Sequence, residues 1–219
     1  MNKNLLKIYE SFLDDLDKLN PNQYDGFRGT NDQVYNEHNY ILSRDKNPEF
    51  FYGLCDMCEY YQIPYNKNGF LQEDLDKITF IKSDNDWISF FQDIISLDEL
   101  QYFHNLEIIE IYSFKSCKEL KSIILPKSLQ EINSNAFNKC ISLKEIIFPE
   151  NIKFIGPGSF LDCENLEKII IPENIKKISN GAFYDCSSLK KIIIPERFKN
   201  NMKYIFYEVN LTKVDIIYI

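Results

Sequence analysis

The side chains best suited to chemistry in this sequence are its six cysteines. Cys55 and Cys58 form a C-x-x-C pair, a spacing found in zinc sites and in redox-active dithiols. A structural zinc ion needs two further ligands, but the chain has no second C-x-x-C pair and only two histidines, His38 and His104. On a helix, residues three apart share a face, so we favour simple burial of the pair, with zinc and redox roles as alternatives. We therefore predict no metal and no cofactor.

The other four cysteines recur every 23 residues, at Cys117, Cys140, Cys163 and Cys186. Stacked copies would bring such positions close to disulfide range, but a repeated buried position is better filled by small apolar thiols. We expect these cysteines to be reduced and buried, as in a reducing compartment.

No arrangement of residues points to catalysis. A nucleophile needs a positioned base, and neither histidine lies in a recognisable catalytic pattern. The phosphate-binding glycine motifs are absent too, so we predict a protein that is not an enzyme and has no catalytic residues. The formal charge of −8 argues against nucleic-acid binding, and no apolar run is long enough for a membrane span. Charge is uneven, with a net of −11 over residues 1–120 and +3 over residues 121–219.

A period of 23 residues organises the second half of the chain. Three residue types besides cysteine repeat at this interval. They are Phe114, Phe137, Phe160, Phe183 and Phe206; Pro126, Pro149, Pro172 and Pro195; and Leu97, Leu120, Leu143, Leu166 and Leu189. The last copy departs from the pattern, because Asn201 replaces an expected isoleucine. A weaker early copy starts at Leu75 and places Trp87 at the position of Ile132.

Each copy predicts one strand followed by a return segment. Residues 120–125 alternate and are rich in β-branched types, and Pro126 then removes a hydrogen-bond donor. The stretch around Phe137 should return as a short helix or turns. One copy cannot bury its own apolar positions, so successive copies must stack with parallel strands.

The repeated Ile-x-Ile-Pro and Ala-Phe-x-x-Cys patterns, seen in Ala136–Cys140 and Ala182–Cys186, resemble the BspA-type leucine-rich repeat family. The resemblance covers about residues 97–216. It implies an α/β solenoid, a short right-handed leucine-rich-repeat superhelix with a parallel sheet on one face. Family members are usually binding modules, several of them surface or secreted proteins of bacteria and protists.

Residues 1–70 lack the period and predict a helical cap or a small accessory domain, followed by the solenoid over residues 71–219 with clear repeats at 97–211. One amphipathic helix is expected from Leu5 to Leu19, ending at Asn20-Pro21. A second is expected to start with Asn47 as cap and Pro48 at its first position, and to stop before Pro64.

Strand alternation predicts which side chains face outward and could bind a partner. One outward column holds Glu99, Ser122, Glu145, Lys168, Lys191 and Lys213, and its neighbour holds Gln101, Ile124, Ile147, Ile170, Ile193 and Asp215. Four exposed isoleucines beside a charge gradient favour a protein-binding face, although isoleucine also simply suits a strand. The predicted partner-binding residues are Ile124, Glu145, Ile147, Lys168, Ile170, Lys191 and Ile193.

The predicted function is a non-enzymatic protein-interaction module whose partner the sequence does not identify. The absence of a signal-peptide pattern at the N-terminus favours a cytoplasmic location. Two alternatives remain: a surface or secreted adhesin-like protein, and a regulator or enzyme acting through residues 1–70. The β-prone segment 214–219 could also pair with a second copy, because an uncovered strand edge invites pairing.

Overall fold

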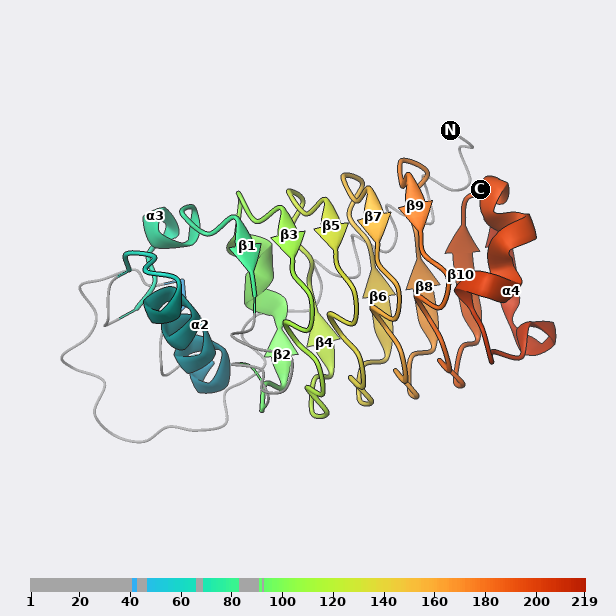
Figure 1. The fold of residues 1–219 in the computed structure, drawn as a ribbon, viewed down its shortest axis with the longest axis horizontal. Helices are drawn as coiled ribbons and strands as arrows, with labels where there is room; N and C mark the ends of the chain where they lie inside the picture. The colour runs from blue at the N-terminus through green and yellow to red at the C-terminus, as the bar shows by residue number, and fades with distance from the viewer. Residues whose placement is uncertain (1–40, 43–46, 66–68, 83–90, 92) are drawn as a thin grey trace. The chain divides into compact units, whose positions relative to one another are not determined.

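The computed structural model describes residues 41–42, 47–65, 69–82, 91 and 93–219, and those up to Tyr218 belong to one compact unit. The helix expected at residues 5–19 and the side chain of Trp87 lie outside the described residues. Within the unit, the chain winds in successive coils that stack along one axis, as expected for a solenoid (Figure 1).

Each regular coil contributes two short strands rather than one, and every pairing between these strands is parallel. The five-stranded sheet consists of β1 (Phe80–Ile81), β3 (Ile108–Ile109), β5 (Glu131–Ile132), β7 (Phe154–Ile155) and β9 (Lys177–Ile178). The four-stranded sheet consists of β6 (Glu145–Ile147), β8 (Lys168–Ile170), β10 (Lys191–Ile194) and β11 (Asp215–Tyr218). Earlier in the chain, β2 (Ser96–Leu97) pairs with β4 (Ser122–Ile123). The expected strand is therefore confirmed, and the strand at Ile132 is an addition.

The 23-residue register holds in the middle of the stack and fails at both ends. Ile146, Ile169 and Ile192 pair in sequence and are buried. At the first end, Leu97 pairs with Ile123, because the 3₁₀ helix η1 (Asp98–Tyr102) lengthens that coil. At the last end, Asp215 pairs with Lys191, after the short 3₁₀ helix η3 (Leu211–Lys213).

These shifts correct four expected positions. Glu99 and Gln101 lie in η1 and Lys213 lies in η3, so none of them belongs to a strand column. Asp215 takes the place beside Lys191, not beside Ile193. The early copy from Leu75 was expected to carry the same strand as residues 120–125. Its strand β1 instead pairs with β3 in the five-stranded sheet.

The core contains a ladder of stacked phenylalanines that confirms the period. Ring centroids of successive residues lie 5.0 to 5.2 Å apart from Phe91 to Phe206. Phe91, one period before Phe114, extends the series that the sequence suggested. Each repeat cysteine donates its thiol hydrogen to the carbonyl of a ladder phenylalanine in the preceding coil, as Cys163 does to Phe137 at 3.2 Å. The ladder residues and the thiols thus join neighbouring coils through one contact repeated along the stack.

The turns around this ladder need left-handed backbone at two positions of each coil except the last, which has one. The first series is Tyr112, Asn135, Gly158 and Gly181, and the second is Ser116, Lys139, Asp162, Asp185 and Glu208. Glycine adopts positive φ without strain, which accounts for Gly158 and Gly181. The non-glycine members accept a conformational cost so that the return segment can turn sharply.

Helix α2 (Pro48–Tyr60) lies at the N-terminal end of the stack (Figure 1). Its start is confirmed, because the Asn47 side chain accepts a hydrogen bond from the Phe50 N–H and Pro48 is the first residue. The Phe50 ring packs against Phe91 at 5.6 Å and against Phe103 at 5.9 Å. The helix therefore covers core that the first coil would otherwise expose. The domain boundary near residue 70 stays a prediction.

The remaining helices are short and lie at the two ends of the unit. Helix α3 (Gln72–Leu75) precedes β1, while η2 (Glu196–Asn201) and α4 (Met202–Ile205) follow β10. Met202, Ile205 and Phe206 are buried, so this last segment continues the core although it forms no strand equivalent to β9.

Candidate interaction surface

The predicted charged column lies on the outer side of the four-stranded sheet. Glu145, Lys168 and Lys191 pair with one another in register, one coil apart. The Lys168 ammonium lies 3.6 Å from a Glu145 carboxylate oxygen, so these two neighbours form an ion pair near the surface. The upstream end of the column is Ser122 beside Ser96, not Glu99. The placement predicted for these three charged residues is therefore confirmed.

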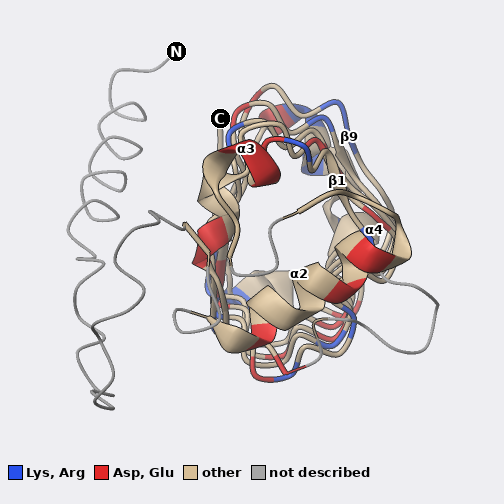
Figure 2. Cartoon of the chain, turned by 90° about the vertical axis from the view of Figure 1, so that its left-hand side faces the viewer, with Lys and Arg blue, Asp and Glu red and all other residues tan. Residues whose placement is uncertain are grey.

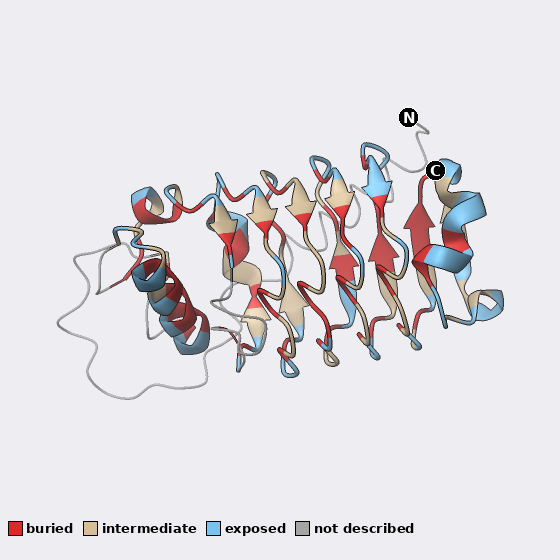
Figure 3. Cartoon of the chain, viewed as in Figure 1, coloured by how far each residue is buried: buried red, intermediate tan, exposed pale blue. Residues whose placement is uncertain are grey.

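The predicted apolar column is placed correctly but is less exposed than expected. Ile147, Ile170, Ile193 and Ile217 pair in sequence, and Ile124 directly follows β4. Ile124 and Ile147 are half-buried, whereas Ile170 and Ile193 are only 7% and 3% exposed. Figure 3 shows burial increasing from β4 to β10.

The expectation that Ile170 and Ile193 are exposed is wrong, and their position explains why. Each lies in a strand with hydrogen-bonded neighbours on both sides, so flanking isoleucines cover it from both directions. Ile147 lies in the edge strand β6, which has a hydrogen-bonded neighbour on one side only. Of the predicted isoleucines, Ile124 and Ile147 thus remain accessible, and the edge strand β11 adds the half-buried Ile217.

The C-terminal strand forms the other edge of this sheet. β11 pairs with β10 alone, and among the described residues no strand follows it. The strand covers Asp215–Tyr218, within the predicted segment 214–219. The Lys199 ammonium lies 5.2 Å from the centre of the Tyr218 ring, which ties the strand to η2. Within the described residues, the outer edge of β11 therefore has no strand partner.

The cysteines have the properties of packing residues. All six are free thiols, and five are buried, Cys55 being the exception. Burial, with smaller effects from Cys55 and Asp74, raises the pKa of Cys58 to about 12. Burial also raises the pKa of Cys140, Cys163 and Cys186. Because the thiolate is the reactive form, these groups are poor nucleophiles near neutral pH.

The described residues offer little for metal binding or membrane insertion. Within the described ranges, histidine, cysteine and carboxylate side chains form no group of three suited to a metal ion. His104 lies 3.5 Å from Asp76 at the surface, and His38 lies outside the described residues. No helix in the described part of the chain combines the length and apolarity that a membrane crossing requires.

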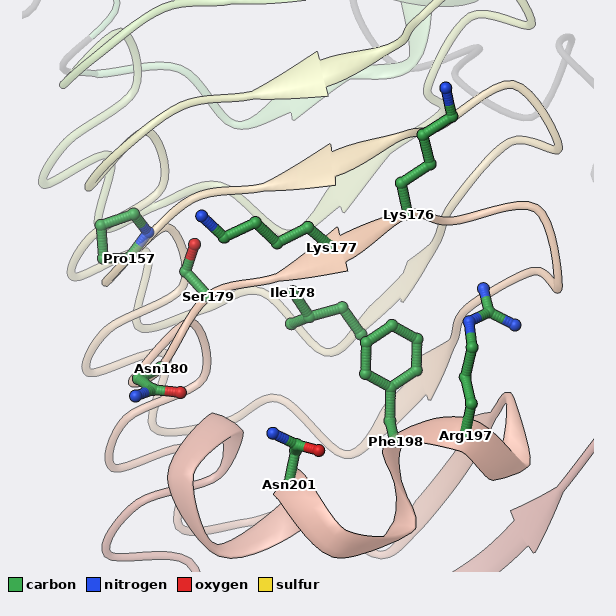
Figure 4. A pocket seen from close by; sticks show the side chains of 9 residues that line it. All are labelled: Pro157, Lys176, Lys177, Ile178, Ser179, Asn180, Arg197, Phe198 and Asn201. Carbon is green, nitrogen blue, oxygen red and sulfur yellow. The ribbon is translucent and has the colours of Figure 1, made fainter.

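A pocket of about 550 Å³ lies between β9 and η2, where the sequence analysis named no site (Figure 4). Lys176, Lys177 and Arg197 line it together with Phe198 and Asn201. The available signal was Asn201, which lies 23 residues after Ile178 and replaces the expected isoleucine. Reading that signal required knowing that each coil has a second strand at this position.

Comparisons with known proteins agree with this architecture. The family model for the BspA type leucine rich repeat region matches residues 88–217 with six copies. A leucine-rich repeat protein from Bacteroides ovatus has a solved structure with a TM-score of 0.50 and 26% identity, covering 66% of this chain. This chain spans only 40% of that protein. No curated protein matches.

Two further solved structures resemble the chain more weakly. A leucine-rich repeat protein of T. pallidum has a TM-score of 0.37 and 21% identity, covering 60% of this chain and 84% of its own. A leucine-rich cell surface protein from Faecalibacterium prausnitzii has a TM-score of 0.39 and 23% identity, covering 53% of this chain and 36% of its own.

Proposed function

Because this chain belongs to the BspA-type leucine-rich repeat family, we propose that it is a non-enzymatic interaction module that binds a protein partner through the outer face of the four-stranded sheet. The observation that carries the proposal is the in-register column of Glu145, Lys168 and Lys191 beside the accessible Ile147. A rigid, regularly spaced row of charged and apolar side chains is suited to recognition of a complementary surface.

The energetics favour a contact in which charge and apolar area act together. Covering one exposed isoleucine fully contributes about 1.5–3 kcal/mol. Ile124 and Ile147 are already half-buried, so together they contribute roughly the amount of one such residue. Association costs several kcal/mol or more. The isoleucines alone therefore do not support a stable complex, and the charged column must orient the partner and add contacts.

The buried isoleucines have a supporting part in this proposal. Ile170 and Ile193 hold the strands that carry Lys168 and Lys191, and they offer little area for direct contact. The proposed contact set is therefore Ile124, Glu145, Ile147, Lys168 and Lys191.

The test is a comparison of variants with a partner captured from native cells by the tagged full-length chain and identified by mass spectrometry. Ile124→Lys with Ile147→Lys should weaken binding of that partner, as should Lys168→Glu with Lys191→Glu. The matched control is Lys139→Glu with Lys203→Glu, two exposed lysines outside the four-stranded sheet and its column. Unchanged binding by both test pairs, with an unchanged melting temperature, would exclude this face.

Location separates the main proposal from the adhesin-like alternative. We propose a cytoplasmic module. Fractionation of native cells should find the chain with the cytosolic proteins, and a chain accessible to protease on intact cells would support an adhesin-like role instead.

A separate function of residues 1–70 is tested by deleting residues 1–39, which keeps the packing of α2 on the core. Loss of binding after this deletion would favour that alternative.

We also propose that a second copy of the chain pairs with the outer edge of β11. The supporting observation is that, among the strands of the described residues, β11 pairs with β10 alone. Light scattering over a wide concentration range should show a dimer that Ile217→Lys weakens, because a charge on an edge strand opposes pairing. A monomer at every concentration would contradict the proposal.

A further inference from the structure

The five-stranded sheet ends before the stack of coils does. Each strand before β9 accepts hydrogen bonds from the next coil, as the Ile155 carbonyl does from the Ser179 N–H at 2.9 Å. The Lys153 carbonyl likewise accepts from the N–H groups of Lys176 and Lys177, at 2.9 and 3.1 Å. Among the described residues no strand after β9 joins this sheet, because the chain next forms β10 of the four-stranded sheet and then η2. Within the described residues, no backbone N–H donates in this way to the carbonyls of Lys176 and Ile178.

The stacking resumes immediately beyond this gap. The N–H groups of Gly181 and Phe183 donate to the carbonyls of Tyr204 and Ile205, at 2.6 and 3.1 Å. The Phe183 ring stacks on Phe206 at 5.1 Å. The last coil is therefore complete along the phenylalanine ladder and lacks only the strand beside β9. The pocket between β9 and η2 occupies the place of that strand (Figure 4).

The side chains around the gap carry positive charge. Lys176, Lys177 and Arg197 line the pocket, no acidic side chain does, and Lys and Arg residues also lie beside β9 in Figure 2. None of these three cations forms an ion pair with a carboxylate of the described residues. The guanidinium of Arg197 is held in place, because its Nη2 donates to the carbonyls of Glu173 and Ile175. Its remaining N–H groups are suited to a carboxylate.

We propose that this gap binds an extended acidic peptide segment of a partner protein, which adds to the edge of β9 in place of the missing strand. Backbone N–H groups of the peptide donate to the carbonyls of Lys176 and Ile178, as the next coil does elsewhere in the sheet. Carboxylates of the peptide lie against Lys176, Lys177 and Arg197, and apolar side chains contact Phe198. Strand addition supplies affinity, and the three cations select acidic sequences.

The experiment measures binding of a fluorescein-labelled hexapeptide of alternating aspartate and valine to the full chain by fluorescence anisotropy. The peptide should bind, its affinity should fall with added salt, and a lysine–valine peptide should bind far more weakly. A third peptide, N-methylated at every residue of the aspartate–valine sequence, keeps the charge but loses its backbone donors on both edges. It should also bind far more weakly, because strand pairing requires those donors.

Matched variants separate the gap from general attraction of anions. Lys176→Glu with Lys177→Glu should raise the Kd of the acidic peptide by about tenfold or more, because two attractive contacts become repulsive. Both side chains are exposed, so the melting temperature should not change. Lys118→Glu with Lys121→Glu makes the same change of charge elsewhere and should leave the Kd nearly unchanged.

Four results would overturn the proposal. They are no binding of the acidic peptide, equal binding of the N-methylated peptide, an equal loss in the control variant, and equal binding of a single-stranded oligonucleotide of the same charge. The last two would indicate a non-specific anion-binding surface. All four leave the proposal for the four-stranded sheet unaffected, because they concern peptide binding beside β9, which belongs to the other sheet.

Discussion

The rings of Phe137 and Phe160 stack with their centroids 5.2 Å apart and their planes inclined by only 8°. The carbonyl of Phe137 also accepts the thiol hydrogen of Cys163, at 3.2 Å. One coil is therefore joined to the next by a ring contact and a side-chain hydrogen bond at the same place. Equivalent pairs of contacts join the neighbouring coils along the ladder.

Truncation of a ladder ring should destabilise the fold strongly. Phe160 is fully buried between Phe137 and Phe183, so Phe160→Ala removes contacts to both neighbours and leaves a cavity. The expected loss in the free energy of unfolding is about 3–5 kcal/mol, measured by urea denaturation. Lys144→Ala, at an exposed site, is the control and should change stability little. A loss below that of an ordinary surface substitution would contradict the assigned packing.

The buried thiols predict a loss of stability at alkaline pH. In the unfolded chain a cysteine has a pKa of about 8.5, and burial raises the pKa of Cys58 to about 12 in the fold. Above pH 8.5 or so the unfolded chain therefore binds fewer protons than the folded chain. Stability is retained below that pH and falls as the pH rises toward the pKa of Cys58 in the folded chain.

The urea midpoint should accordingly decrease between mildly and strongly alkaline pH, in the presence of a reductant. Each raised thiol contributes up to about 1.4 kcal/mol per pH unit. Replacing Cys58 by alanine should make this pH dependence shallower, even though the variant is less stable overall. A pH dependence equally steep in the variant would show that Cys58 is not responsible.

Glycine at a left-handed position should stabilise the chain. Lys139 has φ of 62°, which costs an L-residue about 1–2 kcal/mol, and glycine avoids that strain. Glycine also loses more backbone entropy on folding, so Lys139→Gly should gain up to about 1 kcal/mol. The same change at Lys144, which lacks a positive φ, should lose about 0.5–1 kcal/mol. Thermal unfolding of both variants checks the difference in sign.

Asn47 should stabilise the chain in two ways that variants can separate. Its side-chain oxygen caps α2, and its Nδ2 donates to the Ser96 carbonyl at 3.2 Å and to Glu99 at 3.0 Å. Asn47→Ala removes both contributions, and its capping part alone is worth about 1 kcal/mol. Asn47→Ser can still cap the helix but cannot reach Ser96 and Glu99. The stability of Asn47→Ser, measured by denaturation, should lie between those of the unsubstituted chain and the Asn47→Ala variant.

The period predicted the packing in the middle of the molecule well, because every coil there contacts a neighbour of the same length with equivalent residues at the contact positions. It placed Phe137 over Phe160 and aligned Glu145 with Lys168, and both relationships are confirmed. It failed at the ends, where Leu97 and Asp215 shift because η1 and η3 change the length of the connecting chain. A count of residues does not reveal whether an added segment forms a 3₁₀ helix or continues a strand.

The burial of a side chain was harder to predict than the side of the sheet to which it points. Alternation correctly placed Ile170 on the outer side, but its exposure depends on the flanking strands, which cover it. The two-residue strand β5 was missed because Glu131–Ile132 is too short to show an alternating pattern. The gap beside β9 was not predicted for the same reason. A missing strand can be recognised only where a strand is expected.

The constant coil length has a consequence for how such a chain changes in size. Because neighbouring middle coils meet through equivalent contacts, an in-frame duplication of one unit would find matching surfaces above and below it. Such an insertion would lengthen the molecule by about 4.8 Å and add one row to each outer column, while both ends keep their present partners. Slipped replication of the DNA would thus enlarge the outer face of the sheet one row at a time without redesign of the fold.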